Sequence, residues 1–202
     1  MLAERAAAAA HRCGSPTARA QAAYAQGLAL RASDREGAER ALRLAADLGE
    51  AAGNRWIRAF ALTEVSWLVA QRGRLADGLR GFAEVVDLWC RGGDWANPWL
   101  SLRHVLGVFT ELGAHQAAAV LHGALVAAGA DAALPFEPGD AHKLVEEADR
   151  ARQVLGPLEF DAAVRRGAAM SDANTVAFVQ SEIERLLDAR TDDGREVAEP
   201  PA

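Results

Sequence analysis

The stretch from Asn54 to Gly113 decides the fold, and it reads NRWIRAFALTEVSWLVAQRGRLADGLRGFAEVVDLWCRGGDWANPWLSLRHVLGVFTELG. Its apolar residues recur after 40 positions, as when Phe60 is followed by Leu100. The turn glycines keep the same spacing, in the pairs Gly53 with Gly93 and Gly73 with Gly113. A fixed period of this size is typical of arrays of helix–turn–helix repeats.

The composition favours helix along all 202 residues, because Ala, Leu, Arg and Glu dominate and β-branched residues are sparse. No apolar run reaches the ~18 residues that a membrane span needs. The start, MLAERAAAAAHR, lacks the order of a signal peptide, so we expect a cytoplasmic protein with no membrane partner. Cys13 and Cys90 are expected to be reduced thiols, since they are the only two cysteines of a large helical chain.

The net charge of −6 is unevenly distributed. Residues 1–136 carry 14 basic and 13 acidic groups, whereas residues 137–202 carry 8 basic and 15 acidic groups. Neither part has the basic patch that binding to a phosphate backbone requires. The sequence therefore predicts no direct contact with nucleic acid.

Capping residues and glycines predict where the helices begin and end. The expected N-caps are Ser15 before Pro16, Asp34, Asn54, Asn97 before Pro98, and Ser171. The expected helices span residues 1–13, 16–32, 35–52, 55–72, 75–91, 98–112, 115–128, 141–155, 157–169 and 172–189.

The paired helices resemble tetratricopeptide-like repeats in two respects. Small residues recur where two helices of a repeat cross, at Ala38, Gly78 and Ala118, and Phe82 supplies an aromatic residue. The period is longer than the usual one, near 34, and the consensus order of Trp, Leu-Gly and Tyr is not kept. The resemblance implies an all-α, right-handed helical solenoid.

The expected organisation has four parts. Residues 1–130 form the repeats, 131–140 a loop, 141–189 three C-terminal capping helices, and 190–202 a disordered tail. Residues 1–13 have the phase of the second helix of a repeat, so the first unit is expected to be incomplete and the chain to be the end of a longer array. The alternative is that residues 1–13 are a simple capping helix.

A narrower resemblance covers nearly the whole chain. Segments such as LAADLGEAAGNRW, GRLADGLRGFAEVVDLWCRGGDW, SLRHVLGVFTELG and LGPLEFDAAVRRGAAMSDANTVAFVQSEIERLL are similar to the C-terminal helical region of large actinobacterial regulators. Those proteins join a signal-transduction ATPase to an adenylate-cyclase-like domain or to a DNA-binding domain of the LuxR or antibiotic-regulator type. The resemblance implies a sensor or scaffold role and transfers no catalytic residue.

No motif in the chain predicts an enzyme or a cofactor. A GxxxxGKS/T phosphate loop, a GxSxG elbow and an HExxH zinc motif are all missing from the sequence. The adjacent Glu146 and Glu147 point about 100° apart on a helix, so both are expected to be solvated. One alternative stays open, a helical metal-binding protein that uses His104, His115 or His122 with Glu111.

The best candidate for a binding surface is a row of equivalent positions on the first helices of the repeats. Tyr24, Glu64 and His104 are 40 residues apart, and Arg103 adjoins the last of them. The row would bind a peptide, a partner helix or a small polar ligand, unless these are ordinary exposed polar residues. Trp56 and Trp95 are candidate anchors beside it, the alternative being that the tryptophans form the core between repeats.

These observations predict a non-catalytic, protein- or ligand-binding module of an ATPase-linked transcriptional or signalling regulator. Its expected partner is an upstream ATPase domain of the same polypeptide or complex. A self-association module, which would make the protein a homo-oligomer, is the second hypothesis.

Overall fold

The computed structural model describes residue 10 and residues 12–93, 97–129 and 140–196, and those residues form nine α-helices and no strand. The chain is therefore all-α, as predicted. It divides into two compact units, Met1–Leu88 and Trp89–Ala202. Most of the helix predicted over residues 1–13, the whole loop before Asp140 and the end of the tail lie outside the described residues.

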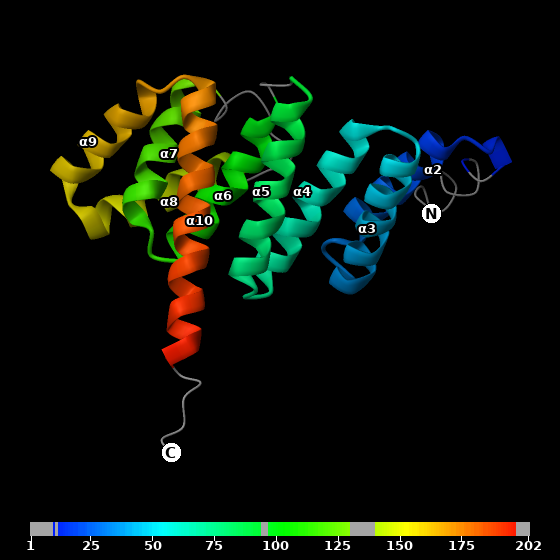
Figure 1. The fold of residues 1–202 in the computed structure, drawn as a ribbon, viewed down its shortest axis with the longest axis horizontal. Coiled ribbons are helices and arrows are strands. Elements are labelled where there is room, and N and C mark those ends of the chain that lie inside the picture. The colour runs from blue at the N-terminus through cyan, green and yellow to red at the C-terminus, as the bar shows by residue number, and fades with distance from the viewer. Residues whose placement is uncertain (1–9, 11, 94–96, 130–139, 197–202) are drawn as a thin grey trace, which may run out of the picture. The chain divides into compact units, whose positions relative to one another are not determined.

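The first unit contains α2 (Pro16–Leu30), α3 (Arg35–Ala51), α4 (Arg55–Gln71) and most of α5 (Leu75–Arg91). In Figure 1, α3 lies between α2 and α4 and packs against both. Its core is built of small side chains on α2 and α3 and larger ones on α4, namely Ala20, Ala23, Ala38, Leu42, Ala45, Ala46, Ile57, Ala61, Val65, Leu68 and Val69. Alanine is small enough to let neighbouring helix backbones approach closely, so these helices pack without large gaps.

The helix hairpins end on glycines in the left-handed conformation. Gly53 and Gly73 have φ of +66° and +79°, and Gly93 and Gly113 have +71° and +75°. After Gly53, the Asn54 amide donates to the Gly49 carbonyl oxygen at 2.7 Å, which is the long hydrogen bond of a Schellman turn. Since only glycine adopts this conformation without strain, the 40-residue repeat of glycine is a repeat of turn geometry.

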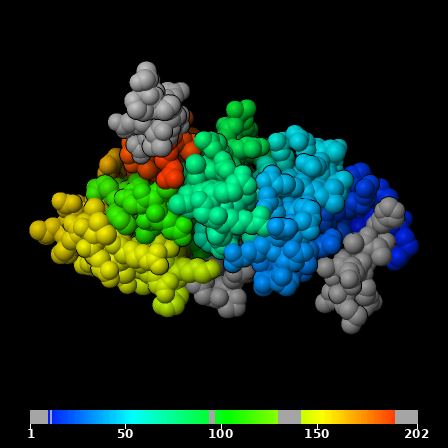
Figure 2. Space-filling view, turned by 90° about the horizontal axis from the view of Figure 1, so that it is seen from below, coloured from blue at the N-terminus to red at the C-terminus, as the bar shows by residue number. Residues whose placement is uncertain are grey.

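The second unit contains α6 (Pro98–Glu111), α7 (His115–Ala127), α8 (Asp140–Leu155), α9 (Pro157–Ala168) and α10 (Asp172–Glu196). α6 and α7 form a hairpin, and α8 and α9 both pack on α7. Figure 2 shows the atoms of α8, in yellow, directly against the green atoms of α7. The three C-terminal helices thus share one core with the last predicted repeat, around Ala119, Val120, Ala148, Ala151, Phe160 and Ala163.

Four of the five predicted N-caps make the expected hydrogen bond. The side chains of Ser15, Asp34, Asn54 and Ser171 accept from backbone amides three residues on, at 3.3, 2.8, 3.2 and 3.3 Å. The prediction for Asn97 is wrong, because its side chain makes no capping hydrogen bond. Its ψ of −23° is helical, whereas a capping residue adopts an extended backbone that directs its side chain at the first turn.

The helix bounds agree with the predicted ones within two residues except at the C-terminus. α10 continues to Glu196, although the sequence predicts an end at Ala189 and disorder from residue 190 onward. A formed helix extends at little cost once its first turn exists, and no proline interrupts the chain before Pro200. Within the described residues no helix is long and apolar enough to cross a membrane.

Candidate functional site

Two members of the predicted row, Tyr24 on α2 and Glu64 on α4, come together in the first unit. The Glu64 carboxylate interacts electrostatically with the Tyr24 phenol. An Arg31 Nη1 donates to Glu64 Oε2 at 2.7 Å, and Glu64 is only 8% exposed. Glu64 is therefore a buried, paired carboxylate, and the alternative that the row consists of ordinary exposed polar residues is wrong for this position.

The environment of the cluster keeps Tyr24 protonated. Burial raises the pKa of the Tyr24 phenol to about 12, the Glu64 carboxylate raises it further, and the Arg31 guanidinium opposes both. A neutral phenol beside an ion pair can donate or accept a hydrogen bond at any physiological pH. The cluster offers recognition by hydrogen bonding and carries no acid–base chemistry near neutrality.

Sequence reasoning missed Arg31, the residue that allows Glu64 to be buried. Arg31 follows Tyr24 by seven residues, which is two helical turns, so both side chains lie on the same face at the end of α2. That spacing is visible in the sequence. The choice of Glu64 as its partner depends on how α2 and α4 pack, which the spacing does not give.

The remaining members of the predicted row, Arg103 and His104, lie on α6 in the second unit, and both are half-buried. Trp95, the second predicted anchor, lies outside the described residues. The row as a continuous surface over three helices therefore stays a prediction.

One face of α4 carries a stripe of aromatic residues, which we call the α4 stripe. It consists of Trp56, Phe60 and Trp67, which are four and seven residues apart and so share one side of the helix. The Trp56 and Phe60 rings are 6.0 Å apart between centroids and inclined by 41°. Trp56 is 45% exposed, whereas Trp89 is 2% exposed. The tryptophans thus divide between core and surface, and Trp56 is a surface residue.

The metal hypothesis finds no support in the part of the chain that the structure describes, where no three His, Cys, Asp or Glu side chains are grouped to hold an ion. His122 instead packs against Phe160, with ring centroids 6.2 Å apart. It occupies the repeat position of Leu42 and Phe82, which are both fully buried. His122 is accordingly a packing residue.

Glu147 on α8 is less solvated than predicted. It is half-buried, and its Oε2 atom is shielded from solvent with no hydrogen-bond partner among the described residues. Burial raises the pKa of the Glu147 carboxyl, while a hydrogen bond with Thr110 lowers it. The packing of α8 on α6 accounts for this burial, because Thr110 belongs to α6. Glu146, in contrast, is exposed as predicted.

Comparison of the chain with protein families, with curated proteins and with solved structures yields no match. The function therefore has to be argued from the residues above.

Proposed function

We propose that the chain is a right-handed, tetratricopeptide-like solenoid with a C-terminal helical cap, and that it binds a protein partner without catalysing a reaction. The repetition of helix hairpins and left-handed turn glycines every 40 residues supports the solenoid. In such arrays the first helix of each repeat lines the concave surface. The first helices here are α2, α4 and α6, which carry all the described residues of the predicted row.

The observation that carries the binding function is the exposed Trp56 at one end of the α4 stripe. Trp and Arg residues dominate the binding energy of protein interfaces, particularly where a polar group lies nearby. Two turns along the same helix, Glu64 pairs with Arg31 beside the Tyr24 phenol. An aromatic anchor and a fixed polar cluster on one helix would give a partner both affinity and register.

The proposed partner is the ATPase module of a signal-transduction regulator, in the same polypeptide or complex. This part rests on the resemblance of the chain to the C-terminal region of actinobacterial regulators. Docking of the ATPase on the α4 stripe would couple binding in the solenoid to nucleotide turnover. It would also place the chain in the cytoplasm.

The test measures binding and ATP turnover of the regulator's ATPase module with increasing amounts of the 202-residue chain. We expect saturable binding and a changed turnover rate. Trp56→Ser should weaken binding roughly 30-fold, since losing a tryptophan anchor costs about 2 kcal/mol. Leu44→Ser is the matched control, because Leu44 is 51% exposed but lies on α3.

The proposal fails if the chain at saturation neither binds the ATPase module nor alters its turnover. Equal losses for Trp56→Ser and Leu44→Ser would also contradict it, because they would indicate non-specific apolar contact. The mass of the chain from light scattering distinguishes self-association: a concentration-dependent dimer that Trp56→Ser converts to a monomer would assign the α4 stripe to a second copy of the chain.

A further inference from the structure

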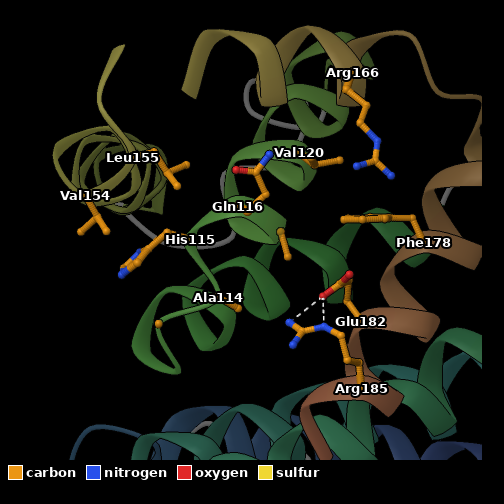
Figure 3. A pocket seen from close by; sticks show the side chains of 12 residues that line it. Ala114, His115, Gln116, Val120, Val154, Leu155, Arg166, Phe178, Glu182 and Arg185 are labelled. Atoms are coloured by element: carbon orange, nitrogen blue, oxygen red, sulfur yellow. Dashed lines mark hydrogen bonds and ion pairs between the residues drawn. The ribbon is translucent and has the colours of Figure 1, made fainter. Parts of the chain in front are cut away.

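The second unit contains a cavity of about 450 Å³ between the start of α7, the end of α8, and the helices α9 and α10. Figure 3 shows its two sides, with Val154, Leu155 and His115 on one and Arg166, Phe178 and Arg185 on the other. Its volume falls within the ~300–1,000 Å³ of pockets that bind small molecules. It lies away from the α2 and α4 surface proposed above, on different helices, so it would be a second site.

One side of the cavity is apolar and incompletely covered. Val120, Val154 and Leu155 form it, and Val154 is 63% exposed. An exposed valine on a cavity wall gains from contact with an apolar ligand, because that contact removes its surface from water. The wall thus favours a ligand with a hydrocarbon portion.

The opposite side holds a cation that has no anionic partner. The Arg166 guanidinium lies over the Phe178 ring, 5.4 Å from the ring centroid. Among the described residues no carboxylate pairs with it. Packing on the ring fixes the plane of the guanidinium and leaves its N–H groups available for a planar acceptor.

The other charges of the cavity largely cancel. Arg185 donates from Nε and Nη2 to Glu182 Oε2, at 2.9 Å in both cases. With that pair neutralised, Arg166 leaves the wall with one positive charge. The first turn of α7, which borders the cavity and has no side-chain cap, adds partial positive charge to a site that the cavity and Arg166 define.

We propose that this cavity binds a small organic acid with one negative charge and a short apolar body. The carboxylate would accept hydrogen bonds from the guanidinium of Arg166, and the hydrocarbon portion would cover Val154 and Leu155. A carboxylate matches the planar, forked geometry of arginine, and a single charge matches the charge of the wall. The site would give the module a chemical signal to sense.

The experiment titrates the full chain with three probes by calorimetry: hexanoate, acetate and hexan-1-ol. Acetate has the charge without the apolar body, and hexan-1-ol has the body without the charge. We expect saturable binding of hexanoate, with acetate and hexan-1-ol each at least roughly tenfold weaker. Arg166→Gln should weaken hexanoate binding by roughly tenfold or more, since a hydrogen bond to a charged group is lost.

Arg165→Gln is the matched control, because Arg165 precedes Arg166 on α9, is exposed and does not line the cavity. It should bind hexanoate like the native chain. Circular dichroism would establish that both variants keep their helical content. Absence of saturable hexanoate binding overturns the proposal, and so does equal binding by the Arg166→Gln chain. Hexan-1-ol binding as tightly as hexanoate would rule out the anion, and acetate binding as tightly would rule out the apolar body.

Discussion

At the scale of single residues, Tyr24 offers a direct measurement because it is the only tyrosine in the chain. Its phenol should ionise near pH 12 in the folded protein and near pH 10 in the unfolded chain. The folded state then holds more protons than the unfolded state between these values, so stability should fall as the pH rises through that window and be unaffected below it. Absorbance of tyrosinate at increasing pH, with helicity monitored in parallel, measures the midpoint.

Glu64→Gln is the informative variant for this titration. The Glu64 carboxylate raises the pKa of Tyr24, so removing its charge should lower the midpoint. Tyr24→Phe should abolish the absorbance change and reduce the loss of stability above pH 10. A native midpoint near pH 10 while the helices remain folded would show that Tyr24 is solvated, contrary to the structure.

The residues of this cluster also show what a sequence gives at this scale. The period of 40 puts Tyr24 and Glu64 at equivalent positions, and the structure brings the two together. The burial of Glu64 was not predictable, because it depends on Arg31 reaching across from α2. An ion pair between helices is determined by their packing, whereas the period reports only the phase of each helix.

At the scale of helices, the crossing of α7 and α9 depends on two glycines. A Cβ atom added at Gly123 would lie 2.1 Å from the Val164 carbonyl oxygen, and one added at Gly167 would be as close to the backbone of Val120. Gly123→Ala should therefore destabilise the chain by ~1–3 kcal/mol, despite the better helix propensity of alanine. Thermal unfolding followed by circular dichroism measures the change.

Ala168→Ser is the control for this substitution, because Ala168 adjoins Gly167 on α9 but is exposed. It should change the free energy of unfolding by less than ~0.5 kcal/mol. If Gly123→Ala instead raised the melting temperature, as helix propensity alone predicts, the two helix backbones would not be in contact.

Helices themselves were more predictable than their crossings. Caps such as Asp34 and turn glycines such as Gly53 act through neighbours in the chain, and the helix ends they predict are found. Asn97 has the same residue type as Asn54, but its backbone conformation differs. The cavity at the start of α7 could not be foreseen, because its walls come from four helices brought together only by folding.

At the scale of the whole molecule, the proposed solenoid makes a prediction that a globular helical bundle does not. In a solenoid each repeat contacts only its neighbours, so a complete repeat is removable without disturbing the phase of the rest. Deleting residues 53–92 joins Ala52 directly to Gly93, which takes the place of Gly53 in the turn. We expect this shorter chain to fold with its helical content per residue preserved and to be less stable than the parent.

Deletion of residues 53–72 alone is the matched control, because it removes α4 and leaves its hairpin partner α5 without a neighbour of the right phase. That chain should lose helicity or aggregate, since the apolar face of α5 is then exposed. Circular dichroism and light scattering of the two chains distinguish the architectures. If the 40-residue deletion unfolds as completely as the 20-residue deletion, the helices form a single cooperative bundle, and the period reflects repeated sequence without an array of exchangeable units.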